Sequence, residues 1–109
     1  MGMPLPGAIS AAISCPDSKV LGLAGDGDFL MNVQEMETAA RLKSDITMLV
    51  WEDHSYGLIE WKQEQEFGTH TDLSFSNPDW IQLGQSFGWK ANVCDQAENL
   101  QSTLRAALD

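Results

Sequence analysis

Apolar residues along this chain cluster in short blocks that predict alternating strands and helices. Two apolar runs, residues 20–24 and 46–51, end in polar turn residues and have the length of buried strands. Between them, residues 29–42 carry apolar side chains at helical spacing, with acidic residues interspersed. A strand, a helix and a strand joined by tight links form a βαβ unit, so we predict a parallel sheet with a right-handed crossover.

The rest of the chain predicts helices around this unit and a third strand. Residues 6–14 are small and apolar, with Pro6 near their start, where the first turn of a helix accepts proline. The segment 77–79, Asn-Pro-Asp, has the composition of a helix cap. The other predicted elements are a helix over 58–65, a polar loop over 67–76, a helix over 80–87, a short third strand over 91–94 and a closing helix over 97–108. We therefore expect one α/β domain covering residues 1–109.

The charge balance excludes several kinds of partner. With 16 acidic and 6 basic residues, the chain has a formal net charge of −10 at pH 7. Nucleic-acid phosphates and anionic membranes are bound through Lys and Arg, which are scarce here. No apolar run approaches the length of a membrane span. We expect no nucleic acid and no membrane among the partners of this protein.

The two cysteines and residues 1–5 indicate in which cellular compartment the protein is found. Cys15 and Cys94 lie far apart, in no Cys-x-x-Cys or Cys/His spacing, so we expect two reduced, partly buried thiols. Residues 1–5 lack the basic start and the long apolar stretch of a signal peptide. These features favour a soluble, cytoplasmic protein.

Each of the two predicted strands is followed by an acidic segment that contains glycine. Asp26 lies between two glycines directly after the first strand, and Asp53 follows the second. Because the carboxyl ends of parallel strands meet at the same edge of a sheet, both carboxylates are expected at one site. Paired oxygen ligands suit Mg²⁺, which also binds phosphate oxygens and water. The pattern predicts a magnesium-diphosphate site.

The sequence over 25–39, Gly-Asp-Gly-Asp-Phe-Leu-Met-Asn-Val-Gln-Glu-Met-Glu-Thr-Ala, resembles the thiamine-diphosphate signature of the acetolactate synthase and 2-oxoacid decarboxylase family. Residues 5–9 resemble the helix start that precedes this signature, residues 79–88 a recurring helix of the family, and residues 96–109 its final helix. The resemblance runs over nearly the whole chain. It implies a three-layer α/β sandwich with a parallel sheet, the thiamine-diphosphate-binding fold, truncated before its last strand as a piece of a larger enzyme.

The resemblance also implies a set of ligands for Mg²⁺. Asp26 matches the aspartate that binds the metal in the family, and Asp53 stands where the family's second asparagine offers a side-chain oxygen. Ser55 would contribute its backbone carbonyl. The metal ligands implied in this way are Asp26, Asp53 and Ser55.

Thiamine diphosphate itself is implied to lie against two segments of the chain. The amides at the start of the helix after the first strand would face the diphosphate, and residues 56–58 would lie along the cofactor. The cofactor-binding residues implied are Gly25, Asp26, Gly27, Asp28, Phe29, Tyr56, Gly57 and Leu58. No residue of this chain is given a catalytic role, because the family's activating glutamate belongs to a separate pyrimidine-binding domain or chain.

Besides Asp53, which replaces an asparagine, three positions depart from the family pattern. Glu52 stands at the family's first asparagine, and Asp28 where relatives often carry a small neutral residue, so both add negative charge to the site. Trp61 comes one position before the tryptophan of biosynthetic acetolactate synthases. One helical position turns a side chain by roughly 100°, so we expect a different substrate wall.

The resemblance implies a parent enzyme that acts on 2-oxo acids such as pyruvate, by decarboxylation and carboligation, as a homo-oligomer. The 109 residues alone are expected to be inactive. One alternative is a non-catalytic binding or assembly module with the same fold, its metal site degraded by Glu52 and Asp28. Another is a metal-dependent glycosyltransferase type, in which Asp26 and Asp28 form an Asp-x-Asp pair. Metal-dependent binding of thiamine diphosphate separates these hypotheses.

Overall fold

Two parallel strands and the helices around them make up the fold. A computed structural model describes residues 1–109. Strand β1 (Val20–Gly25) pairs with β2 (Ile46–Trp51) in the predicted parallel sense. The register runs from Val20 opposite Ile46 to Gly25 opposite Trp51, so both strands end at the same edge. The predicted βαβ unit is therefore confirmed.

The helices follow the predicted order, except that the helix predicted over 29–42 is split into two. They are α1 (Pro4–Ser14), α2 (Asp26–Leu30), α3 (Glu35–Leu42), α4 (Gly57–Phe67), α5 (Trp80–Ser86), the 3₁₀ turn η1 (Ala97–Asn99) and α6 (Leu100–Leu108). The single helix predicted over 29–42 is wrong, because residues 31–34 form a turn between α2 and α3. Backbone amides there donate to carbonyls three residues earlier, which tightens the chain and divides the helix.

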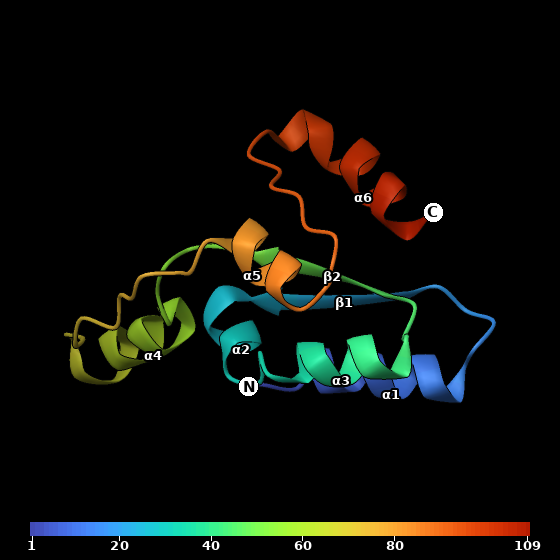
Figure 1. Ribbon diagram of the computed structural model, residues 1–109. Coiled ribbons are helices and arrows are strands. Elements are labelled where there is room, and N and C mark those ends of the chain that lie inside the picture. Colours follow the sequence, from blue (N-terminus) through green and yellow to red (C-terminus); the bar gives the residue numbers. More distant parts are fainter.

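The core lies on one face of the sheet, against α1 and α3. Its buried cluster comprises Leu5, Ile9, Ala24, Phe29, Met36 and Ala39. Gly22 and Ala24 turn inward from β1, whereas Leu21 and Leu23 are exposed on the other face. In Figure 1, α1 and α3 run side by side on one side of the strands and α6 lies on the other. The expected three layers are present.

The third strand predicted over 91–94 is wrong. The sheet has two strands, and this segment forms no ladder with either of them. Just before this segment, the Trp89 indole Nε1 donates to the Met36 carbonyl at 3.1 Å and so anchors the chain over α3. Ala91 packs on Gly84 of α5 so closely that a Cβ on residue 84 would lie 2.7 Å from the Ala91 Cβ. Trp89 and Ala91 thus contact helices, and residues 91–94 pair with no strand.

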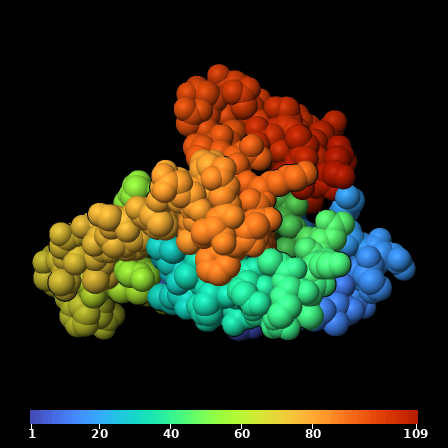
Figure 2. Space-filling view, in the orientation of Figure 1, coloured from blue at the N-terminus to red at the C-terminus, as the bar shows by residue number.

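The molecule is elongated, with extents of 48 × 30 × 24 Å. Its radius of gyration is 15.4 Å, against about 13 Å for a close-packed chain of this length. Figures 1 and 2 show why, since α4 and the loop after it project from one end and the C-terminal α6 lies beyond the sheet, on the side opposite α1 and α3. Helix α4 contains no buried residue.

Two expectations from the sequence concern surface properties. Cys15 and Cys94 are free but exposed, so their expected partial burial is wrong. Each lies in a connecting segment outside the core, where nothing covers it. None of the helices has the length and apolar character needed to cross a bilayer.

Candidate functional site

Asp26 lies at the point where the two strand ends meet. It opens α2 directly after β1, and its side chain is almost fully buried, with 1% of the residue exposed. Its Oδ1 accepts a hydrogen bond from the Gly27 amide at 2.8 Å. Its Oδ2 accepts from the amides of His54 (2.8 Å) and Asp53 (3.2 Å), which follow β2. The parallel register thus brings Asp26 and the Asp53 segment together.

The carboxylate of Asp26 is held in its charged form. Burial raises the pKa of Asp26, but hydrogen bonds from Asn77, His54, Gly27 and Asp53 outweigh burial and leave the pKa below its ordinary value of 3.8. Asn77 contributes through Nδ2, which lies 2.7 Å from Oδ2. A buried anion with this many donors is ionised at neutral pH.

The backbone after β2 has an unusual conformation that serves this contact. His54 has a φ of 60°, in the left-handed region that few non-glycine residues adopt, although His is enriched there. With this turn the successive amides of Asp53 and His54 both donate to one oxygen of Asp26, as in an anion-binding nest. His54 therefore acts in the site through its backbone.

A cavity of about 300 Å³ opens beside Asp26. Its lining residues are Met1, Gly25, Asp26, Gly27, Asp28, Asp53, Ser55, Tyr56, Gly57, Leu58 and Ile59. Every residue expected at the cofactor or the metal lines this cavity except Phe29. The Phe29 side chain is buried in the core, where it meets Trp80 edge-on with ring centroids 6.0 Å apart.

Aromatic rings approach Gly27 closely on one side of the cavity. The rings of Tyr56 and Phe75 pack against each other at a tilt of 47°, with their centroids 5.0 Å apart. A Cβ on Gly27 would lie 2.6 Å from Cε1 of Tyr56 and 3.1 Å from Cζ of Phe75. Glycine is needed here because no side chain fits between α2 and these rings, rather than because of a special backbone angle.

The oxygen atoms around the cavity fit a hard cation with a phosphate ligand. No group of three or more His, Cys, Asp or Glu side chains is gathered as a metal site. Mg²⁺ does not need one, because it is commonly held by one or two carboxylates together with phosphate oxygens and water. Asp26 and Asp53 supply the carboxylates, and the hydroxyl of Ser55 is buried without a hydrogen-bond partner. The residues present therefore suit a magnesium diphosphate.

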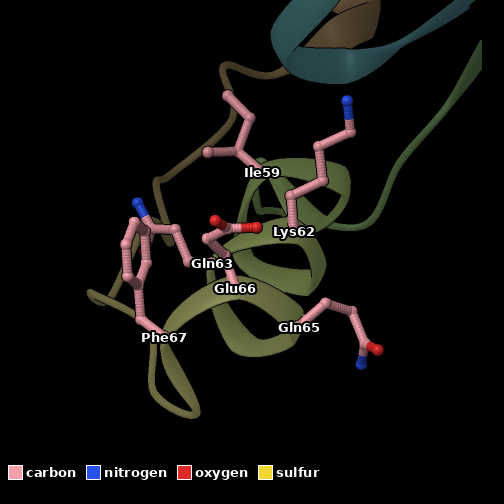
Figure 3. A pocket seen from close by; sticks show the side chains of 6 residues that line it. All are labelled: Ile59, Lys62, Gln63, Gln65, Glu66 and Phe67. Atoms are coloured by element: carbon pink, nitrogen blue, oxygen red, sulfur yellow. The ribbon is translucent and has the colours of Figure 1, made fainter.

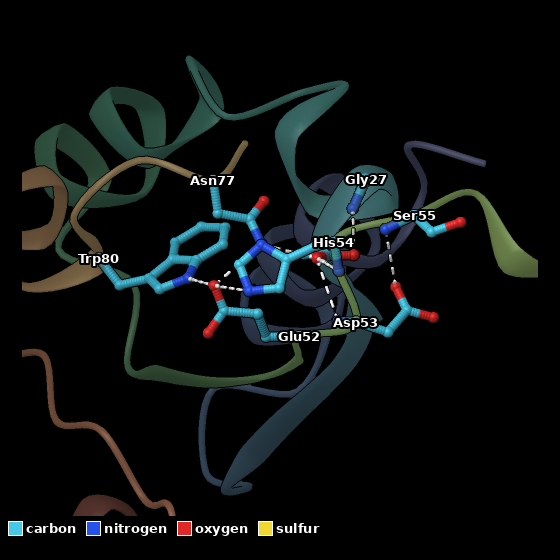
Figure 4. Close-up of polar contacts among 8 residues, drawn as sticks. Gly27, Glu52, Asp53, His54, Ser55, Asn77 and Trp80 are labelled. Atoms are coloured by element: carbon cyan, nitrogen blue, oxygen red, sulfur yellow. Dashed lines mark hydrogen bonds and ion pairs between the residues drawn. The ribbon is translucent and has the colours of Figure 1, made fainter. Parts of the chain in front are cut away.

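The structure separates Glu52 from this cavity. Glu52 Oε1 accepts from Asn77 Nδ2 at 2.9 Å and from the Trp80 indole at 3.0 Å, and lies 3.5 Å from His54 Nε2. The Trp80 and Asn77 hydrogen bonds lower the pKa of Glu52. Figure 4 shows Glu52 turned toward Trp80 and His54, with Asp53 and Ser55 on the other side. Its charge is directed away from the cavity.

The carboxylate of Asp28 lines the cavity but already has a partner. It accepts a hydrogen bond from the Gly2 amide, while the Asn32 carboxamide donates to the Gly2 carbonyl at 2.6 Å. These contacts fix the first residues of the chain beside α2 and bring Met1 to the rim of the cavity.

Sequence reasoning identified the Asn77 segment only as a helix start. Asp79 does cap α5, accepting from the Gln82 amide at 2.9 Å. The hydrogen bonds of Asn77 to Asp26 and Glu52 were missed, because they join residues far apart in sequence and no local spacing reports them.

A second hollow lies along α4, at the projecting end of the molecule. Its volume is about 470 Å³, and Figure 3 shows its lining. The lining residues are Ile59, Lys62, Gln63, Gln65, Glu66 and Phe67. They offer one cation and one carboxylate on a single exposed helix, without the converging polar groups found around Asp26. The cavity at the strand ends is the better candidate site.

Comparisons with known proteins place this geometry in context. Residues 1–109 match the family model described as "Thiamine pyrophosphate enzyme, C-terminal TPP binding domain". The chain is 35% identical to the catabolic acetolactate synthase of Raoultella terrigena, over 100% of this chain and 20% of that protein. It is 33% identical to the acetolactate synthase of Bacillus subtilis (strain 168), over 100% of this chain and 19% of that protein. The chain thus spans about a fifth of the length of these relatives.

A solved structure has the same arrangement of elements. The thiamine diphosphate-dependent 4-hydroxybenzoylformate decarboxylase of Rhodococcus jostii RHA1 superposes with a TM-score of 0.88 at 25% identity. The match covers 99% of this chain and 21% of that one. It confirms the predicted α/β fold with a parallel sheet.

Proposed function

This chain belongs to the thiamine pyrophosphate enzymes, as a C-terminal TPP-binding domain similar to those of acetolactate synthases, and we propose that its strand-end cavity binds thiamine diphosphate through Mg²⁺. The observation that carries this proposal is the buried, ionised Asp26 beside a cavity lined by Asp53 and Ser55. Negative groups converge there in a chain that is acidic overall. A divalent cation would let a diphosphate approach them.

The residues divide into two roles in this proposal. Asp26 and Asp53 hold Mg²⁺ through carboxylate oxygens, and Ser55 adds its backbone carbonyl. The cofactor lies along the cavity wall, against Gly25, Asp26, Gly27, Asp28, Tyr56, Gly57 and Leu58. Phe29 supports the wall from the core instead of touching the cofactor. Thiamine diphosphate, when bound, supplies carbanion-stabilising chemistry.

The parent protein is proposed to act on 2-oxo acids such as pyruvate, by decarboxylation and carboligation. Two relatives named acetolactate synthase support this substrate class, as does the similar fold of a 4-hydroxybenzoylformate decarboxylase. Because the chain corresponds to about a fifth of those proteins, we expect it to need a pyrimidine-binding domain or chain and to be inactive alone. A cytoplasmic location stays a prediction.

Calorimetric titration of thiamine diphosphate into the 109-residue protein, with Mg²⁺ and then with EDTA, tests the cofactor site. We expect binding that requires Mg²⁺ and is weakened at least a hundredfold by Asp26→Ala, since a direct charged ligand is lost. Asp45→Ala is the matched control, because Asp45 is exposed at the opposite end of β2 and its loss removes the same charge.

The possible results separate the hypotheses. Metal-independent binding, or equal effects of the two alanine variants, would contradict the proposed site. A folded chain that binds no thiamine diphosphate would favour the non-catalytic module. Binding of a nucleoside diphosphate in its place would favour the Asp-x-Asp alternative, against which the family match over residues 1–109 already argues.

A further inference from the structure

Asn77 connects the two acidic strand ends with a single carboxamide. Its Nδ2 lies 2.7 Å from Asp26 Oδ2 and 2.9 Å from Glu52 Oε1, so its two N–H groups can serve both carboxylates. Figure 4 shows the Asn77 side chain reaching down over Glu52 and His54 from the segment before α5. No other side-chain donor contacts both carboxylates.

The hydrogen bonds on Asp26 are distributed unevenly between its two oxygens. Oδ2 accepts from Asn77 and from the amides of Asp53 and His54. Oδ1 accepts only from the adjacent Gly27 amide. A carboxylate offers about two acceptor positions on each oxygen, so Oδ2 is saturated and Oδ1 retains capacity. One oxygen of this carboxylate is therefore engaged by three donors, and the other by a single donor.

Contacts of neighbouring residues help to place Asn77. The Phe75 amide donates to the His54 carbonyl at 2.9 Å, which ties the preceding residues to the turn after β2. On the other side, the Trp80 indole donates to the same Glu52 oxygen that Asn77 contacts. The backbone thus ties the Asn77 segment to the turn after β2, and Trp80 holds the Glu52 oxygen to which the carboxamide donates.

From these contacts we infer that Asn77 is a positioning residue, which holds Asp26 by Oδ2 and keeps Oδ1 free for the cation of a magnesium diphosphate. The inference rests on the proposed function for the identity of the ligand. It also assigns a role to Glu52, which gives Asn77 and Trp80 a common acceptor and so orients the carboxamide. Asn77 acts through Asp26 and touches neither metal nor cofactor.

Amide hydrogen exchange in the ligand-free chain tests the hold on Asp26 without any cofactor. Asn77→Leu keeps the size of the side chain and removes its donors, and we expect the amides of Asp53 and His54 to exchange at least tenfold faster. Ser76→Ala, at the exposed neighbouring position, is the control and should change neither amide. Unchanged exchange at both amides in Asn77→Leu would overturn the inference.

Amides within β1 and β2 report whether the variant is folded. If Asn77→Leu speeds exchange throughout the strands, Glu52→Gln provides the second variant. It keeps an acceptor for Trp80 and Asn77 but removes the charge, so the amides of Asp53 and His54 should stay protected. Equal loss of protection in Glu52→Gln would show that charge on Glu52, rather than orientation of Asn77, controls the contact.

Titration of thiamine diphosphate with Mg²⁺ tests the consequence for binding. We expect Asn77→Leu to weaken the affinity at least tenfold and Ser76→Ala to leave it unchanged. Affinity equal to that of the unmodified chain would overturn the positioning role. If the unmodified chain does not bind, the proposed function has failed, and the exchange experiment still decides whether Asn77 holds Asp26.

Discussion

The carboxylate of Asp26 is buried, and three backbone amides and one carboxamide compensate its charge. Burial alone would favour the neutral form, whereas the hydrogen bonds favour the anion and prevail. The same bonds tie α2 to the turn after β2 and to the segment before α5. One side chain thus serves both as the centre of the site and as a junction between distant parts of the chain.

The stability of the fold should depend on pH through Asp26. Because its pKa is lower in the folded chain than its ordinary 3.8, Asp26 stabilises the fold fully above that value, and the contribution is lost as the pH falls through the folded pKa. We expect Asp26→Asn to lower the free energy of unfolding by about 2 kcal/mol at pH 7. The difference from the unmodified chain should shrink toward pH 3.

Chemical denaturation at several pH values between 7 and 3 measures this difference. Glu52, whose pKa is also lowered, adds a dependence of the same sign that both proteins share. A difference that stays constant over the whole range would contradict the assignment of Asp26 as a stabilising anion.

At the scale of single elements, α5 shows how packing decides what a segment becomes. Gly84 is buried in the middle of this short helix, directly against Ala91. Trp89 anchors the following chain to the Met36 carbonyl. Ala91 therefore packs on α5 while Val93 stays 65% exposed, and residues 91–94 form no strand although their composition predicts one.

Gly84→Ala should destabilise the protein even though alanine favours helices. Helix propensity would contribute about 1 kcal/mol of stabilisation, but the new Cβ would lie 2.7 Å from the Ala91 Cβ, and overpacking of this kind costs about 1–3 kcal/mol. We expect a net loss of about 1 kcal/mol, seen as a fall of about 4 °C in the midpoint of thermal unfolding.

The double variant Gly84→Ala/Ala91→Gly is the matched test of this explanation. It removes the methyl group that the new side chain would meet, so stability should return to that of the unmodified chain or above. Failure to recover in the double variant would mean that the contact with Ala91 is not the cause.

At the scale of the whole molecule, much apolar surface lies outside the core. Leu58 (69% exposed), Trp61 (57%) and Phe67 (73%) stand on the projecting α4, and Leu23 (58%) stands on the face of the sheet opposite α1 and α3. Exposed apolar side chains of this size are commonly covered by contact with other molecules. They agree with a chain whose relatives are about five times as long.

We expect the 109-residue protein to associate with itself through α4. Replacing both Trp61 and Phe67 with Gln removes two large apolar side chains without adding charge, and should weaken self-association at least tenfold. Sedimentation velocity over a range of concentrations measures the change, with Gln65→Ser on the same helix as the control. A monomeric unmodified chain, or equal association of all three proteins, would contradict this prediction.

The local pattern of the sequence determined most of the elements and the place of the site. Short apolar runs predicted β1 and β2, because strands of a covered sheet are continuously apolar. A parallel pair must end at one edge, so Asp26 and Asp53 were expected together from their positions alone. These features depend on neighbours in sequence and on the rule that parallel strands end at the same edge of a sheet.

Only the tertiary structure decided the rest. Phe29 belongs to the core instead of the cavity, Glu52 turns toward Trp80 instead of the site, and Asn77 reaches Asp26 across the molecule. Ala91 packs on Gly84 of α5, and residues 91–94 form no strand. Each outcome depends on which side chains compete for the same space or the same hydrogen-bond partner, and that competition is between residues distant in sequence, which local periodicity does not contain.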